Sequence, residues 1–463
     1  MQRIFKVSTI LLCAVYIASF ITGCGSGAGG AAQTTAAQTT AAAAAADTTT
    51  AAAAEAATEA PTSAATETPA ARTEISFWHD WGGDEEKQIN GIIDKYNESQ
   101  DKYTLVGLVS GDVQKIKVAI AGGAGPDVFT NYSSNLAAYA EEGILENLDS
   151  YIARDGITFE DYIPSVVDAM SYKGSVYAIS HEPTIMMMYY NKRLLKEAGY
   201  DAPPATVSEM MEIAYATTKV ESDGTIIDLG FPDFPFVYYP DAMMYALGGR
   251  LFDDSGKFTP DNPGRLQALS LIAEFRETYG LEKVIQFNDS GKYCDPSDPF
   301  FTGNQALRID GAWLAMLSAE YGIDQDICDF GVAPLPYPDG HPELAKGASL
   351  SSGLFLTSIN AKNKEGAWDF YKWVHEGNWA LERKCFPAQM SLLTNSAYDT
   401  VKNFNDFADM AKSPNLVASP MHPKSVEFSK MLGDQTELVA NLKLSPEEAM
   451  KNAAEEVNKL LEE

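Results

Sequence analysis

Aromatic side chains and carboxylates in this chain stand directly after two short runs that are expected to be β-strands. Trp81 and Asp80 follow the run at residues 74–78, and Trp313 follows the run at residues 306–310. An aromatic ring offers a flat apolar surface, and a carboxylate accepts hydrogen bonds from hydroxyl groups. A pyranose has apolar C–H faces and a rim of hydroxyls, so this mixture of side chains suits a sugar.

The run at residues 74–78 predicts how Asp80 and Trp81 are positioned. Its polar and apolar residues alternate, as in an opening β-strand. Ligands of open α/β sheets bind outside the carboxyl ends of the strands, so Trp81 is expected to stack on a ligand and Asp80 to accept its hydroxyls. Two alternatives stay open: Trp81 closes the core, or Asp80 caps the helix expected at residues 85–97.

The stretch at residues 172–206 predicts a crossing between two sheets. Residues 175–180 alternate as a short strand, Pro183 interrupts it, and residues 185–190 form a continuous apolar run. That run is long enough for a strand buried on both faces and too short for a helix. A strand that stops at a proline and resumes as a buried strand implies two lobes.

Four motifs spaced along the chain resemble those of one protein family. They are G-x-x-P-D-V-F at residues 123–129, G-x-V-Y-A-I at residues 174–179, Y-Y-N-K-x-L-L-K-E-A-G-Y-D-x-P-P-x-T at residues 189–206, and the segment at residues 300–313 that ends in Gly-Ala-Trp. Together they resemble the extracellular solute-binding proteins of bacterial ABC importers, in the carbohydrate-binding, maltose-binding-protein-like class.

The resemblance implies an α/β, two-lobed periplasmic-binding-protein-like fold with a hinge and an inter-lobe ligand cleft. The first lobe would hold residues 73–183 and 354–405, and the second lobe would hold residues 184–353 and 406–463. Crossovers near residues 180–186 and 347–354 would absorb the rotation when a ligand closes the cleft. The closed protein would then dock on the transmembrane permease subunits of an ABC importer.

The resemblance also places further residues at the cleft, and each has a plainer alternative. Glu182 could be a solvated loop charge, Tyr238 and Tyr239 could pack on the next helix, and Trp313 could belong to the core. The expected ligand-binding residues are Asp80, Trp81, Asn131, Tyr132, Ser133, Glu182, Thr184, Tyr238, Tyr239, Trp313, Gly347 and Ser349.

The first 72 residues have the layout of an exported, lipid-anchored protein. Residues 1–23 form an expected signal peptide, and Ile21 to Cys24 resembles a lipobox, after which Cys24 would carry the lipid. Residues 24–72 are rich in Ala and Thr and lack large apolar side chains, so they are expected to be a disordered tether. The expected location is the outer face of the bacterial cell membrane, with an ordinary signal peptide as the alternative.

Composition limits the partners of the remaining chain. The whole chain has a formal net charge of −30, nearly all of it beyond residue 72, and this charge repels nucleic acid and other polyanions and favours neutral or cationic ligands. Outside the leader, Cys294, Cys328 and Cys385 permit at most one disulfide, and no C-x-x-C pair indicates metal or redox work. A monomer that needs no cofactor and no metal is expected.

Three short segments resemble enzyme motifs, but each lacks a residue that its motif requires. The glycines at residues 122–125 lack the Lys-Ser/Thr of a phosphate-binding loop, and His181-Glu182 is not the zinc motif because Ile185 replaces the second histidine. Residues 347–351 miss the nucleophile elbow at their last position.

The main competing function is a secreted glycoside hydrolase. It would use two carboxylates among Asp80, Glu182 and Asp310. A surface sensor or adhesin that binds sugar without a permease is the third possibility. The separated family motifs favour a binding protein that is not an enzyme.

Overall fold

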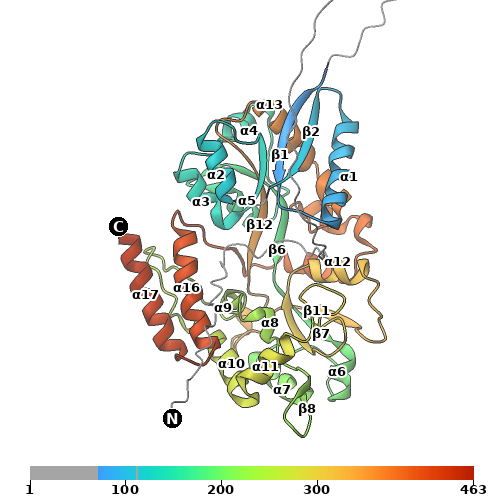
Figure 1. Cartoon of the computed structure of the whole chain (residues 1–463), viewed down its shortest axis with the longest axis vertical. Coiled ribbons are helices and arrows are strands. Elements are labelled where there is room, and N and C mark those ends of the chain that lie inside the picture. The colour runs from blue at the N-terminus through green and yellow to red at the C-terminus, as the bar shows by residue number, and fades with distance from the viewer. Residues whose placement is uncertain (1–70, 111–112, 463) are drawn as a thin grey trace, which may run out of the picture.

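The structure is a computed structural model that describes residues 71–110 and 113–462. Two β-sheets lie one above the other along its longest axis, each covered by helices, and strands β6 and β12 run between them (Figure 1). The expected signal peptide, Cys24 and nearly all of the tether lie outside the described residues.

The first sheet is mixed and has the strand order β13-β12-β3-β1-β2, with β6 paired to the other edge of β12. Strands β1, β2 and β3 are parallel, whereas β12 runs antiparallel to β3 and β6. Strands β3 and β6 therefore point the same way as β1. The strands are β1 (Thr73–His79), β2 (Tyr103–Val109), β3 (Val128–Tyr132), β6 (Ala178–Ile185), β12 (Ala348–Thr357) and β13 (Leu416–Ala418).

Alternate residues of this sheet face two helical layers. Phe77 and Phe355 belong to the core beneath α1, α13 and α14, while Phe129 and Leu354 belong to the core beneath α2, α3 and α5. This is the period-two pattern of a sheet buried on both faces. The helices are α1 (Asp84–Ser99), α2 (Val113–Ala121), α3 (Ser133–Glu141), α4 (Asp149–Asp155), α5 (Pro164–Met170), α13 (Lys364–His375) and α14 (Asn378–Arg383).

The predicted interruption at Pro183 is wrong. Strand β6 runs through Pro183 and pairs with β12 as far as Ile185, because β6 is an edge strand and a proline there need not supply a ladder hydrogen bond. The irregularity is a bulge at His181, which has no partner between Glu182 opposite Gly353 and Ser180 opposite Leu354. The strand ends at Ile185, and β7 begins after Met186.

The second sheet is small and antiparallel, with β7 between β10 and β11. Its strands are β7 (Met187–Asn191), β10 (Leu307–Asp310) and β11 (Phe330–Ala333). Short hairpin strands are β4 (Ser171–Tyr172), β5 (Ser175–Val176), β8 (Lys219–Val220) and β9 (Ile226–Asp228). The helices around this sheet are α6 (Lys192–Glu197), α7 (Val207–Thr217), α8 (Asp233–Phe236), α9 (Pro240–Ala246), α10 (Pro263–Tyr279), α11 (Leu281–Asn288), α12 (Trp313–Glu320) and α15 (Phe404–Met410).

The C-terminal helices α16 (Ser425–Ala440) and α17 (Pro446–Glu462) form a hairpin beside both halves (Figure 1). They share a core with α10, and the Ser425 hydroxyl donates a hydrogen bond to the Ser134 carbonyl in α3. The chain therefore connects the two halves a third time, after β13.

The first sheet extends beyond the lobe boundaries expected from sequence. Residues 184–185, 348–353 and 416–418 were expected in the second lobe, yet all of them pair within the first sheet. The reason is that β12 pairs along its whole length, with β6 on one edge and with β3 and β13 on the other. Phe407 of α15 lies within the expected second lobe, and it packs on Tyr189 of the second sheet.

Two global properties follow from the described residues. No helix within residues 71–110 and 113–462 is long and apolar enough to cross a membrane. Cys294, Cys328 and Cys385 are all buried, and no disulfide joins them.

Candidate functional site

The ends of β1 and β3 bring Asp80 and Tyr132 together at one edge of the first sheet. Asp80 accepts hydrogen bonds from the Thr130 hydroxyl at 3.0 Å and from the Tyr132 hydroxyl at 3.1 Å. Burial raises the pKa of Tyr132, and the nearby carboxylates raise it further, so this phenol stays neutral and donates. Both side chains keep partial exposure to solvent.

Glu85 and Glu182 lie beside this pair and share one cation. Arg383, only 5% exposed, donates to Glu182 at 3.2 Å and to Glu85 at 3.1 Å. Burial raises the pKa of Glu85, Arg383 opposes that shift, and Glu182 and Asp80 add to it. Two carboxylates bind the guanidinium and Asp80 lies nearby, so this edge of the sheet is acidic. We call Asp80, Glu85, Glu182, Tyr132 and Arg383 the acidic edge.

Trp81 lies in the core rather than at the open surface. It is 7% exposed and packs against His181 and Trp379, with ring centroids 5.1 and 5.5 Å away. The Arg383 guanidinium lies over its ring at 5.0 Å. This is the core alternative that the sequence left open, and it leaves little of the ring for a ligand.

Several other expected site residues have structural partners. Asn131 is buried and donates to the Tyr139 hydroxyl, while Ser133 is buried and accepts from the Ser352 amide. Gly347 is buried, and a β-carbon there would meet the backbone of Leu344 and Ala246.

Thr184 and Ser349 are half-buried on β6 and β12. They lie on the paired strands that join the two halves.

In the second half, Trp313 begins α12 directly after β10. Its indole Nε1 donates to the Tyr293 hydroxyl at 3.2 Å, and Tyr293 donates to the fully buried Asp310 at 3.0 Å. A β-carbon added at Gly311 would overlap the Trp313 ring, and Gly311 does not have a positive φ. Glycine at position 311 therefore leaves room for the indole.

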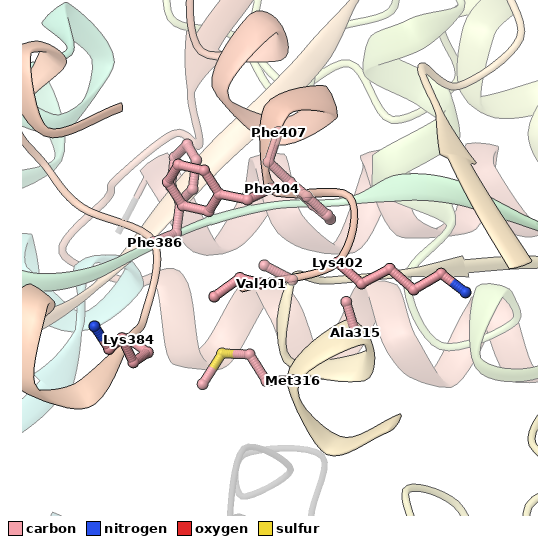
Figure 2. Close-up of a pocket in the computed structure, with 9 residues that line it drawn as sticks. Ala315, Met316, Lys384, Phe386, Val401, Lys402, Phe404 and Phe407 are labelled. Atoms are coloured by element: carbon pink, nitrogen blue, oxygen red, sulfur yellow. The ribbon is translucent and has the colours of Figure 1, made fainter. Parts of the chain in front are cut away.

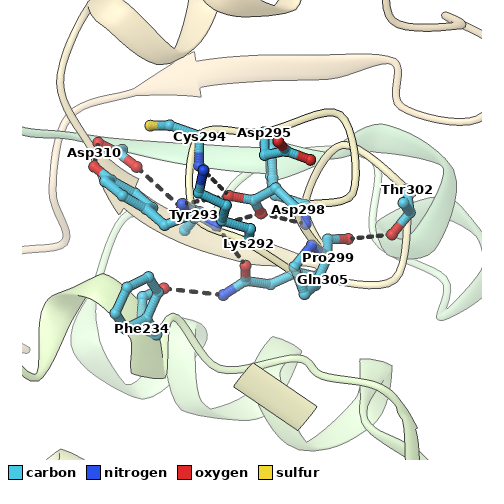
Figure 3. A network of polar contacts seen from close by, with 12 residues as sticks. Phe234, Lys292, Tyr293, Cys294, Asp295, Asp298, Pro299, Thr302, Gln305 and Asp310 are labelled. Carbon is cyan, nitrogen blue, oxygen red and sulfur yellow. Dashed lines mark hydrogen bonds and ion pairs between the residues drawn. The ribbon is translucent and has the colours of Figure 1, made fainter. Parts of the chain in front are cut away.

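A buried ion network supports Tyr293 (Figure 3). Arg308, 1% exposed, binds Asp298 through two hydrogen bonds of 2.8 and 3.1 Å and binds Asp310 at 3.0 Å. Burial raises the pKa of Asp310, and Arg308 opposes that shift. Because Asp310 is fully buried and bound on all sides, it is not placed to act as a catalytic carboxylate on a sugar.

Aromatic rings continue from Trp313 and Tyr293 along this half. Phe234 meets Tyr293 edge-on at 5.3 Å and Tyr238 at 5.7 Å. Tyr238 is 63% exposed, and burial raises the pKa of the half-buried Tyr239 to about 12. We call Phe234, Tyr238, Tyr239, Tyr293 and Trp313 the aromatic wall.

A small pocket lies between α12 and the segment at residues 384–407 (Figure 2). Phe386, Phe404 and Phe407 face Met316 across it, and its two lysines are engaged elsewhere: Lys384 with a backbone carbonyl and Lys402 with Asp329. Such a lining offers few hydrogen bonds to a sugar, so the acidic edge and the aromatic wall are the better candidate site.

Sequence reasoning missed Glu85, Arg383, Phe234 and Tyr293. Glu85 lies in the first turn of a helix, where an acidic residue is ordinary, and Arg383 comes from a helix about three hundred residues further along the chain. Phe234 belongs to the aromatic and proline-rich segment at residues 231–239, in which only Tyr238 and Tyr239 were expected at the cleft. Tyr293 lies in a loop without periodicity, so no sequence signal pointed to it.

A metal site is not formed by the described part of the chain. Within residues 71–110 and 113–462, no three His, Cys, Asp or Glu side chains are grouped so that they could hold an ion.

The fold, with acidic and aromatic candidate residues in different halves, is that of a two-lobed binding protein. The model of the bacterial extracellular solute-binding proteins matches residues 91–377. The chain therefore belongs to that family, as the sequence motifs indicated.

Named relatives bind different small molecules. The chain is 28% identical over 308 residues to the maltotriose-binding protein of Pyrococcus abyssi, covering 65% of this chain and 62% of that protein. It is 22% identical over 422 residues to the sn-glycerol-3-phosphate-binding periplasmic protein UgpB of Yersinia pestis, covering 84% of this chain and 93% of the relative.

Solved structures of similar fold contain sugars. CpMnBP1 with mannotriose bound superposes with a TM-score of 0.73 at 23% identity, covering 83% of this chain and all of the other. An ABC substrate-binding protein from Listeria monocytogenes in complex with cycloalternan gives 0.68 at 21% identity, covering 84% and 99%. These likenesses establish the two-lobed periplasmic-binding-protein-like fold.

Proposed function

We propose that this chain captures a neutral carbohydrate outside the cell and delivers it to an ABC importer permease. The observation that carries the proposal is that one half holds an aromatic wall and the other half holds carboxylates that can accept hydrogen bonds from hydroxyls. A sugar would lay its apolar C–H faces on the rings and donate its hydroxyls to Asp80 and Glu182. The mannotriose, cycloalternan and maltotriose bound by similar proteins support this ligand class.

The acidic edge favours a neutral sugar over glycerol phosphate. Asp80, Glu85 and Glu182 supply three carboxylates, and Arg383 is the one guanidinium bound to two of them. A phosphate brought to this edge would meet net negative charge and would lose its hydration without gaining a cation. The similarity to proteins that bind sn-glycerol 3-phosphate therefore does not indicate the same ligand for this chain.

Closure of the two lobes is the proposed mechanism. We assign residues 73–183 and 354–405 mainly to the first lobe and the remaining folded residues mainly to the second. A ligand that touches both lobes stabilises the closed arrangement, because it makes only half of its contacts when they are apart. The junction of β6 with β7 and the start of β12 would absorb the rotation.

We also propose that the protein is anchored outside the cell and works with a permease. A signal peptide over residues 1–23 and a lipid on Cys24 would hold the protein at the outer face of the cell membrane, and residues 24–72 would act as a tether. We propose a monomer that works with permease subunits and carries out no catalysis. Incubation with maltotriose or mannotriose followed by product analysis tests the last point, because released monosaccharide would indicate a glycoside hydrolase.

A ligand panel tests the central proposal. Thermal unfolding is measured with maltotriose, mannotriose and sn-glycerol 3-phosphate, and a ligand at a hundred times its Kd should add about 2.7 kcal/mol to the free energy of unfolding. We expect a rise with a sugar and none with glycerol phosphate. Trp313→Ala should remove the rise while leaving the unliganded midpoint nearly unchanged. Stabilisation by glycerol phosphate alone would refute the proposal.

A further inference from the structure

The hydrogen bonds from Trp313 to Asp310 run in one direction only. An indole Nε1 can only donate, and an ionised carboxylate can only accept. The Tyr293 hydroxyl between them must therefore accept from Trp313, at 3.2 Å, and donate to Asp310, at 3.0 Å. The indole N–H is thereby used inside the protein, and the orientation of the Trp313 ring is tied to the place of the Tyr293 hydroxyl.

Tyr293 is itself fixed from three sides. Asp310 holds its hydroxyl, the Arg308 guanidinium lies over its ring at 5.1 Å, and the Phe234 ring meets it edge-on at 5.3 Å. Asp298 binds Arg308 through two hydrogen bonds, and it also accepts a hydrogen bond from the backbone amide of Cys294 at 3.0 Å. The ion network thus anchors the loop next to Tyr293 as well as the side chain that faces it (Figure 3).

We propose that Tyr293 and Asp310 are positioning residues that hold the Trp313 ring ready for a sugar. This inference rests on the proposed function. One face of the indole lies against Gly311, and its N–H is bound by Tyr293. What Trp313 offers a ligand is therefore a ring face without a donor, so this position selects the C–H face of a pyranose and does not recognise any particular hydroxyl.

Pre-positioning matters because an aromatic ring that must be ordered on binding costs free energy. Tyr293→Phe keeps the ring but removes both hydrogen bonds, so it releases the Trp313 indole. We expect Tyr293→Phe to raise the Kd for maltotriose or mannotriose about fivefold to twentyfold. Asp310→Asn would also break the chain of hydrogen bonds, but it leaves Arg308 short of a charge partner and is therefore a poorer test.

A double-mutant cycle separates positioning from a general loss of packing. The Kd for maltotriose and for mannotriose is measured by calorimetry for the native protein, Tyr293→Phe, Trp313→Phe and the double variant. Phenylalanine at position 313 keeps a ring face but has no N–H for Tyr293 to hold. Tyr293→Phe should therefore change the Kd by less than about twofold in the Trp313→Phe background.

Tyr215→Phe is the matched control. Tyr215 also donates its hydroxyl to a carboxylate, that of Glu274 at 2.7 Å, but it lies on α7 away from the aromatic wall. Its loss should leave both Kd values unchanged. Equal effects of Tyr293→Phe in the native and Trp313→Phe backgrounds would overturn the positioning role.

A second measurement does not depend on the ligand. The indole N–H signal of Trp313, assigned by its loss in Trp313→Phe, should exchange with solvent faster after Tyr293→Phe. An unchanged exchange rate would show that the hydrogen bond is absent and would overturn the inference. If neither sugar binds the native protein while this rate still depends on Tyr293, the proposed ligand class fails and the hydrogen-bond geometry stands.

Discussion

Gly311→Ala is the sharpest perturbation that the structure offers. A β-carbon at position 311 would lie closer than 3.0 Å to ring carbons of Trp313, a separation that real β-carbon contacts essentially never show. The position has no positive φ, so alanine adds no backbone strain of its own. The indole must therefore move, and with it the hydrogen bond to Tyr293.

The expected size of the effect follows from what the ring contributes. Burying a large apolar side chain against a partner is worth about 1.5–3 kcal/mol, which corresponds to a change in Kd of about tenfold to a hundredfold. Overpacking a core costs about 1–3 kcal/mol of folding stability. Because Trp313 is only partly buried and can turn outward, we expect Gly311→Ala to lose about 1 kcal/mol or less of stability.

Calorimetric binding of maltotriose or mannotriose and urea unfolding of the unliganded protein are measured on the same preparations. Gly91→Ala is the control, since Gly91 is exposed on α1 and a β-carbon there meets nothing within 4 Å. It should leave the Kd unchanged and stabilise the helix by about 0.5–1 kcal/mol. An unchanged Kd in Gly311→Ala would refute the assignment of Trp313 to the ligand.

Two further predictions concern the first sheet. Burial lowers the pKa of His181 well below 6.5, and Arg383 lowers it further. Below pH 6.5 the unfolded chain therefore binds a proton at His181 that the folded protein does not bind. This residue should lower the free energy of unfolding by up to about 1.4 kcal/mol for each pH unit below 6.5. Urea unfolding at pH 7 and pH 5.5 should show a smaller loss in His181→Phe, and an equal loss would contradict this account. Arg383→Met leaves Glu85 and Glu182 without their cation and should cost about 3 kcal/mol of stability, measured by urea unfolding at pH 7; a cost below about 1 kcal/mol would mean that solvent already screens the pair.

The strands that carry the site were predictable because their patterns are strong. Residues 74–78 and 306–310 were expected as strands, and β1 (Thr73–His79) and β10 (Leu307–Asp310) confirm them. Asparagine is a preferred N-cap residue, and Asn191 caps α6 by accepting a hydrogen bond from the Leu194 amide. Periodicity and helix caps depend only on neighbouring residues, so they can be predicted without knowledge of the fold.

What the sequence left unpredicted depends on contacts between distant segments. Pro183 looked like a break because a proline in a central strand would lose a hydrogen bond, and only the topology shows that β6 is an edge strand. Trp81 was assigned to the surface or the core with equal reason, and the packing of Trp379 and His181 decides for the core. Tyr293 is positioned by its hydrogen bonds with Asp310 and Trp313, which come later in the chain.

The place of β12 in the first sheet has a consequence for the order in which this chain assembles. Strands β3 and β6 pair with its two edges, yet β12 is synthesised more than 150 residues after both. Until residue 357 has emerged, the first sheet lacks the strand that joins β3 to β6 and cannot close its core. Such late, non-local pairing slows folding. A chain that must pass through a translocation channel before it becomes compact gains time from that delay.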